Sequence, residues 1–338
     1  MDLSQFTSDP SDPAWEKPRY EALHTIRPFS PKHPDSIDKK DLTERAKALD
    51  SISMELNTLA ARNAPLSDIE SYIGQFEVAS SKGPIIQRNI LAWFSDTNAL
   101  QWACGNNNPD TVRFLLQKGL SVTPRAVIHA AAKLRETHDT TVMQILLDFG
   151  WDINEPLGET RPPLISTILE VPELVSWCLS KGADPGLSSP SGCSIIEIAA
   201  CRASLSTLET LVELAGRVAD GAPVARASYF HTLGSTPDRV EVVRYLLDQG
   251  YSVDAFYKAY HAAGDCSHEE MLFGSQNALH FAIWAGKEDM VRLLLERGAD
   301  RTLPTRSAMK TDGQTLSPLD LARKFGHTAI IELLSQEA

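Results

Sequence analysis

The sequence predicts an all-α fold built from pairs of short helices that stack on one another. Residues 277–300, NALHFAIWAGKEDMVRLLLERGAD, hold two consecutive segments with apolar residues at helical spacing. Neither segment is long enough to be a stable helix alone in water, so the pair must pack against similar pairs. Similar pairs are indicated elsewhere, because the end of the second segment recurs as LLQKGLS (115–121), LLDFGWD (146–152), CLSKGAD (178–184) and LLDQGYS (246–252).

The spacing of the glycines in these stretches indicates a regular repeat. Gly119, Gly150 and Gly182 are 31 and 32 residues apart. The step from Gly182 to Gly250 is 68 residues, which leaves room for one more copy between them. The step from Gly250 to Gly298 is 48 residues, which is longer than one period and predicts an insertion. We therefore predict about seven repeats, with weaker copies at 208–216 and 317–334.

A helix–turn–helix unit with a period near 33 residues resembles the ankyrin repeat, whose marker in the first helix is T-P-L-H-x-A. The resemblance covers roughly residues 98–334. It implies an ankyrin-repeat solenoid of paired antiparallel helices with short β-turn fingers, in which the inner helices and fingers form a concave groove that binds another protein. The stretches that carry it are NALHFA (277–282), SPLDLA (317–322), SIIEIA (194–199), AVIHAAA (126–132), GADP (182–185) and GADR (298–301).

We divide the chain into three parts. Residues 1–35 hold six prolines among polar residues and predict an extended tail. The apolar residues of this tail fit a segment that packs along the array, a docking peptide for another protein, or plain disorder. Residues 36–97 show helical patterns without the repeat and predict an N-terminal helical cap over the first repeat. Residues 98–338 are predicted to form the ankyrin repeat array, with an inserted loop at 255–274.

Composition argues against several classes of function. The net charge of −12 disfavours a nucleic-acid-binding surface, and no stretch reaches the apolar length of a membrane span. The five cysteines contain no CxxC pair and indicate free thiols, so we expect a cytoplasmic or nuclear protein. No phosphate-binding loop, nucleophile elbow or zinc-protease motif is found in the sequence. We expect no cofactor, no metal and no catalytic residue, and we expect a monomer.

The resemblance implies that the last two positions of each inner helix face the groove. In the unit at 277–300 one of them is Trp284, whose indole would anchor a partner or pack under the inserted loop. The resemblance also places Trp102 at the interior position x of the marker and His280 at its His position, where the imidazole bridges neighbouring turns. The two positions in other repeats are Gly105/Asn106, Lys133/Leu134, Leu169/Glu170, Cys201/Arg202 and Lys324/Phe325. Of these, Lys133, Glu170, Arg202, Lys324 and Phe325 are the candidate contact residues.

The inserted loop, AFYKAYHAAGDCSHEEMLFG, is rich in aromatic residues. Tyr257, Tyr260 and Phe273 should bury either against the groove beside Trp284 or against a partner. The loop also carries His261 within a group of titratable residues that could hold zinc, form a thiolate–imidazole pair, or decorate an exposed loop. The other members of that group are Asp265, Cys266, His268 and Glu269.

Two kinds of function fit these observations. The first is a non-catalytic protein–protein interaction scaffold that grips a partner with the concave groove and the 255–274 finger. The alternative is a small-molecule-binding protein or an atypical enzyme, with a pocket between the 255–274 loop and Trp284. A deep pocket with buried titratable groups would favour the second, and an open groove would favour the first.

Overall fold

The fold is described from a computed structural model of the 338-residue chain. The residues described are 53–80, 98–216, 221–232, 239–257, 276–306 and 315–336. Within these ranges the regular structure is helical, and the one β-type contact is an isolated antiparallel bridge between Ser188 and Ser194. The prediction of an all-α fold is confirmed. The tail at 1–35 and most of the insertion lie outside the described residues.

The chain forms two compact units, residues 1–133 and 134–338, which we describe separately. In the first unit, a helix over 53–61 is followed by α3 (Leu66–Ser80), and α3 packs against α6 (Pro109–Gln117). Helix α5 (Ala99–Gly105) precedes α6, and α7 (Pro124–Thr137) crosses the boundary between the units. Asn106, at the end of α5, donates from its side-chain amide to the Ala60 carbonyl oxygen at 2.8 Å. Helical residues before the repeats therefore contact the first repeat directly.

The second unit continues as helix pairs of similar length. Its first helices are η3 (Leu164–Thr167), α10 (Ile195–Arg202), α12 (Pro223–Thr232), α15 (Ala278–Trp284) and α17 (Pro318–Phe325). Its second helices are α8 (Thr141–Asp148), α9 (Pro172–Ser180), α11 (Leu205–Ala215), α13 (Val240–Asp248), α16 (Glu288–Glu296) and α18 (Thr328–Ser335). Helix η3 is a single 3-10 turn, because Pro162 and Pro163 stand where a longer helix would need backbone donors.

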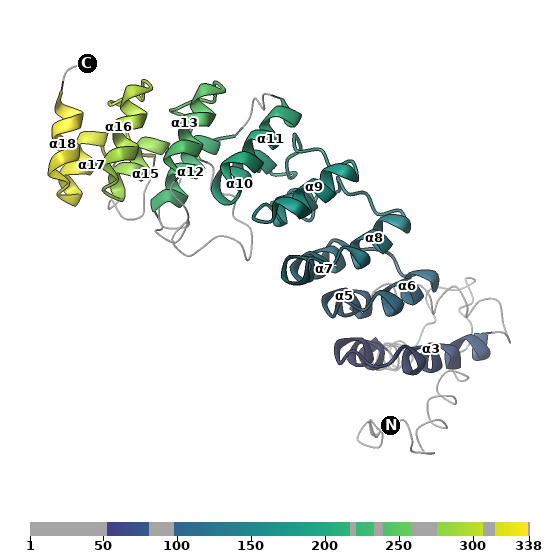
Figure 1. Cartoon of the computed structure of the whole chain (residues 1–338). Helices are drawn as coiled ribbons and strands as arrows, with labels where there is room; N and C mark the ends of the chain where they lie inside the picture. The colour runs from purple at the N-terminus through teal and green to yellow at the C-terminus, as the bar shows by residue number, and fades with distance from the viewer. Residues whose placement is uncertain are drawn as a thin grey trace, which may run out of the picture. The chain divides into compact units, whose positions relative to one another are not determined.

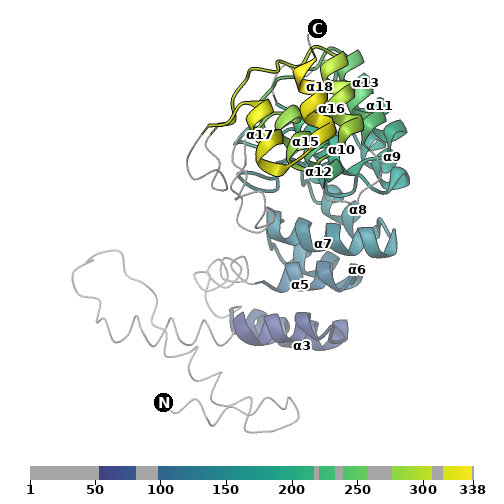
Figure 2. The ribbon, with the colours of Figure 1, turned by 90° about the vertical axis from the view of Figure 1, so that its left-hand side faces the viewer.

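The helices of the second unit form two rows. The first-helix row consists of η3, α10, α12, α15 and α17, each in contact with the next. The second-helix row consists of α11, α13, α16 and α18, which also contact one another in order. Figures 1 and 2 show the rows side by side, one helix of each pair in each row. Leu279 and Ala282 of α15 and Val291 and Leu294 of α16 are fully buried where the rows meet.

The recurring glycine ends the second helix of a pair because it adopts a left-handed backbone. Gly298 has φ +84, and the N–H of Ala299 behind it donates to the Leu294 carbonyl oxygen at 2.9 Å. A residue with a Cβ rarely adopts such a φ, so glycine is favoured at this point. The same conformation occurs at Gly119, Gly150, Gly182 and Gly250. The glycine spacing in the sequence thus reports the spacing of helix ends.

Trp102 departs from its predicted interior position. Its side chain is 39 % exposed, and its ring meets the His129 ring edge-on at 5.8 Å between centroids. The buried stripe of α5 runs through Leu100 and Ala103, and at helical spacing Trp102 falls on the opposite side. The marker therefore located the helix but gave the wrong exposure for this residue.

His280 bridges neighbouring turns as predicted. Its Nδ1 accepts from the Asn277 N–H at 3.4 Å, so the proton of the neutral ring lies on Nε2, which donates to the Leu303 carbonyl oxygen at 2.9 Å. Burial lowers the pKa of His280 from 6.5 to about 4. A second proton would place a donor on Nδ1, where it would face the Asn277 N–H. The folded chain therefore holds this imidazole neutral at physiological pH.

We expect His280 to make the chain less stable in acid. Below pH 6.5 the unfolded chain protonates this residue, whereas the folded chain resists protonation until about pH 4. The contribution is therefore complete above pH 6.5 and is lost as the pH falls, by roughly 3 kcal/mol in total. Urea unfolding of wild type and His280→Gln at neutral pH and near pH 4 measures it, because carboxylate effects are common to both proteins. An equal acid loss in the two proteins would contradict the assignment.

Candidate partner-binding surface

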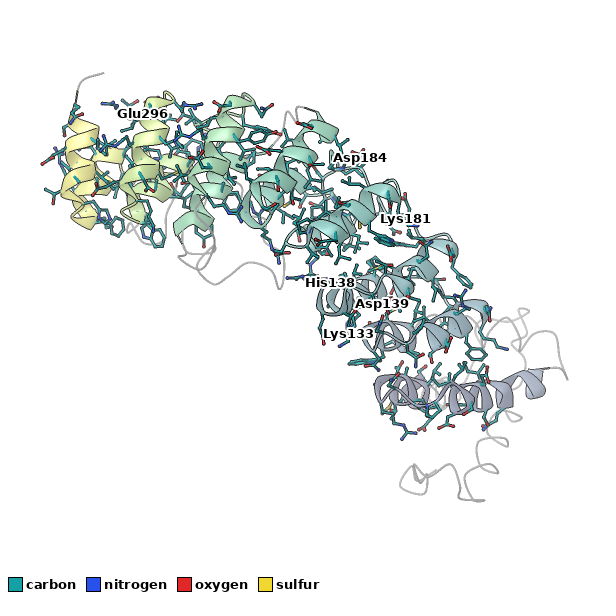
Figure 3. The ribbon with its side chains drawn as sticks, in the orientation of Figure 1. Lys133, His138, Asp139, Lys181, Asp184 and Glu296 are labelled. Carbon is teal, nitrogen blue, oxygen red and sulfur yellow. The ribbon has the colours of Figure 1, made fainter. Side chains whose placement is uncertain are left out.

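The predicted groove residues lie at or near the C-terminal ends of first helices. Arg202 is the last residue of α10, Trp284 is the last of α15, and Lys324 and Phe325 are the last two of α17. None of these four is buried. Two further predicted residues occupy comparable places: Glu170 shortly after η3, and Lys133, labelled in Figure 3, near the end of α7.

Three aromatic residues lie at or just after the ends of α15 and α17: Trp284, Phe325 and His327. The Phe325 and His327 rings stack at 6.3 Å between centroids with an interplanar angle of 23°. His327 Nε2 lies 3.5 Å from the Trp284 carbonyl oxygen, so the histidine connects the two helix ends. Gly286 permits this approach, because a Cβ there would lie 2.8 Å from His327 Cε1. Trp284 and Phe325 are both half-buried.

A charged group lies at the ends of α7, η3 and α10. Arg202 Nε donates to Glu170 Oε1 at 2.5 Å, and Arg135 Nη2 lies 3.8 Å from the same oxygen. The side chains of Arg135, Glu170 and Arg202 are 43 %, 35 % and 37 % exposed. The structure therefore brings together two predicted residues, Glu170 and Arg202, and adds Arg135, which the sequence did not single out. Exposed pairs of this kind contribute only about 0–1 kcal/mol to stability.

Tyr257 is buried within the chain, which agrees with the predicted burial of the loop aromatics but not with Tyr257 as a partner-contact residue. It is 2 % exposed, and its ring packs against Phe281 at 6.3 Å between centroids. The Arg226 guanidinium lies 5.4 Å from the same ring. The apolar ring, held among buried side chains of α12 and α15, is therefore part of the core at the start of the insertion.

The two ends of the insertion meet at the N-terminal end of α15. The Tyr257 N–H donates to the Gln276 carbonyl oxygen at 2.8 Å, and Phe256 packs under the Arg306 guanidinium at 3.8 Å. Trp284 lies at the other end of this seven-residue helix, roughly 9 Å away along its axis. Tyr260, His261 and Phe273 lie outside the described residues, as do the titratable neighbours of His261. The pocket between the loop and Trp284 stays a prediction.

Sequence reasoning missed a buried polar group that joins α10 to α12. Glu197 is fully buried, and its carboxylate accepts from the Ser194 N–H at 3.0 Å and the Ala222 N–H at 2.8 Å. Beside it, Arg226 Nε donates to Cys201 Sγ at 3.2 Å. Burial raises the pKa of Cys201 to about 12, so this thiol stays protonated and unreactive at neutral pH. The S-x-x-E pattern at 194–197 was the available signal, since it is a capping box.

Neither a cluster of metal-ligand residues nor a membrane-spanning helix is found in the part of the chain that the structure describes. Among these residues, no three His, Cys, Asp or Glu side chains are grouped so that they could hold a metal ion. No helix in the same residues is both long enough and apolar enough to cross a membrane.

Comparison with known proteins identifies the repeat. The sequence model of the ankyrin repeat family matches residues 96–127 and 275–306, which contain α5 and α6 in one case and α15 and α16 in the other. No curated protein matches the sequence. Among solved structures, the chain is similar to the human ASB11 ankyrin repeat domain, with 20 % identity and a TM-score of 0.45, over 71 % of this chain and 98 % of that one. The two family matches fall on two helix pairs of the stacked all-α fold, and in these two stretches the chain is similar to ankyrin repeats.

Proposed function

We propose that this chain is a non-catalytic scaffold that binds another protein through the C-terminal ends of its first helices, with the 255–274 segment as a further contact. Ankyrin repeats are in general protein–protein interaction modules. The observation that carries the proposal is the set of aromatic residues at two adjacent helix ends: the Phe325 and His327 rings stack, His327 contacts the Trp284 backbone, and Trp284 and Phe325 are each half-exposed. A partner that covered these rings would bury apolar area at a rigid position.

Trp284→Ala is expected to weaken partner binding by more than about 1 kcal/mol, or roughly fivefold in Kd. The fold should change little, because the ring is half-exposed and stands at the end of α15. Affinity purification with mass spectrometry identifies the partner, and calorimetric titration of the purified partner measures the change. Leu214→Ala is the control, because Leu214 is 61 % exposed on α11 in the second-helix row. Equal partner affinity of wild type and Trp284→Ala would contradict the proposal that Trp284 anchors the partner.

The proposal includes a monomeric protein in the cytoplasm or nucleus. The proposed compartment is supported by the four cysteines among the described residues, all of them buried free thiols: Cys104, Cys178, Cys193 and Cys201. Burial raises the pKa of Cys104, Cys178 and Cys201 to about 12, which suits a protein that works with reduced cysteines. Imaging of a fluorescent fusion and light scattering of the purified chain test the two parts of this statement.

A further inference from the structure

Charge is segregated between the two rows of the second unit, although the chain as a whole carries −12. The second-helix row, α11, α13, α16 and α18, holds eight Asp or Glu and two Lys or Arg, a net charge of −6. Glu296, at the end of α16 in Figure 3, is one of the eight. The first-helix row holds four Lys or Arg and two Asp or Glu, a net charge of +2. One of its two acids, Glu197, is fully buried.

Arg202 of this row meets two charged residues that the count leaves out, Arg135 of α7 and Glu170 after η3. Two guanidinium groups share a single carboxylate oxygen, and the Arg239 guanidinium interacts with the same carboxylate, so positive charge exceeds negative charge here. Arg202 uses only its Nε for Glu170, and no described residue accepts from its two Nη groups. Arg135 stands 3.8 Å from the shared oxygen, which is beyond hydrogen-bond distance. Donors on both arginines therefore remain for a second acceptor.

Structural need does not account for this arrangement. The three side chains are about 35–43 % exposed, and ion pairs at such exposure add about 0–1 kcal/mol to stability. A guanidinium group has a planar fork of donors that fits a carboxylate in two-point contact. Two forks beside one carboxylate present an incomplete site, in which a carboxylate from outside would complete the pairing.

We propose that Arg135, Glu170 and Arg202 form the docking point for an acidic segment of the partner, with a partner carboxylate bound between the two arginines. This inference rests on the proposed function and names the chemistry of the partner. Charge complementarity favours an acidic peptide aligned with the first-helix row, where the acidic second-helix row would repel a misplaced one. A nucleic acid fits less well, because a phosphate backbone needs a long run of cations and this chain is acidic overall.

The test uses a fluorescein-labelled polyglutamate peptide and fluorescence anisotropy with the full chain at low ionic strength. Arg202→Gln and Arg135→Gln should each weaken binding about tenfold, the loss of one charge-assisted hydrogen bond. Glu170→Gln should instead tighten binding, because it removes the internal carboxylate that competes for both arginines. Arg292→Gln is the matched control, since Arg292 is an exposed arginine of α16 in the second-helix row. A polyglutamine peptide controls for contacts that do not depend on charge.

Opposite signs for Glu170→Gln and Arg202→Gln would support the docking point, since a loss of structure would move both in one direction. Equal affinities of Arg202→Gln and Arg292→Gln would overturn it. A labelled oligothymidylate that binds more tightly than polyglutamate, and that depends on Arg202, would also overturn it in favour of a phosphate backbone. With the purified partner, a loss on Trp284→Ala without a loss on Arg202→Gln would retain the proposed function and reject this inference.

Discussion

Leu294→Ala is expected to lower the free energy of unfolding by roughly 2–5 kcal/mol. Leu294 is fully buried, with 0 % of its surface accessible to solvent. It lies on the side of α16 that faces α15. Truncation removes buried methyl groups and leaves a cavity that rigid helices fill poorly. Because each repeat is stabilised by its neighbours, the loss should also weaken the stacking of α13 and α18 on α16.

Chemical denaturation, monitored by circular dichroism, measures this loss of unfolding free energy. The control is Leu214→Ala, the same substitution at a second-helix leucine that is 61 % exposed, where a change within about 0.5 kcal/mol is expected. Indistinguishable unfolding curves for Leu294→Ala and wild type would show that the buried face of α16 is wrongly assigned.

Glu197→Ala is expected to cost about 3–5 kcal/mol, the range for removing one partner of a buried charged group. Two buried N–H donors, at Ser194 and Ala222, would lose their acceptor, and Arg226 would lose a nearby negative charge. The contact between α10 and α12 depends on this carboxylate, because Gly221 approaches it so closely that a Cβ there would lie 2.9 Å from Glu197 Cδ.

Thermal and urea unfolding of Glu197→Ala should be compared with Glu213→Ala, a glutamate exposed on α11. The exposed change should stay within about 0.5 kcal/mol of wild type. Similar values for the two variants would mean that the Glu197 carboxylate is accessible to water in solution and does not join the two repeats.

The repeat architecture was predictable because it depends on local, periodic features. A left-handed backbone after the second helix favours glycine, so Gly150, Gly182 and Gly298 mark helix ends wherever the repeat occurs. Apolar spacing identified α15 and α16, and the T-P-L-H-x-A marker placed His280 correctly in its bridging role. The glycine helix ends and the apolar spacing are set by residues within one or two turns of one another, and the role of His280 follows from its fixed place in the repeat.

The candidate surface was less predictable because it depends on contacts between repeats. Glu170 and Arg202 are 32 residues apart, and Arg135 joins them only because the ends of three repeats align. Tyr257 was expected to bury beside Trp284 or against a partner, yet its ring packs against Phe281 in the core of the next repeat. Trp102 matched a marker position, but exposure is decided by which face of α5 its neighbours cover. A single sequence carries no direct signal of such long-range alignment.

The central claim is that the partner covers the C-terminal ends of the first helices. Hydrogen–deuterium exchange of the full chain, alone and saturated with the partner identified by affinity purification, tests it most directly. The account predicts slower exchange in peptides that contain Arg202, Trp284 and Lys324, with unchanged exchange in α11, α13 and α16. Protection confined to α11, α13 and α16 would place the partner on the second-helix row and contradict the account.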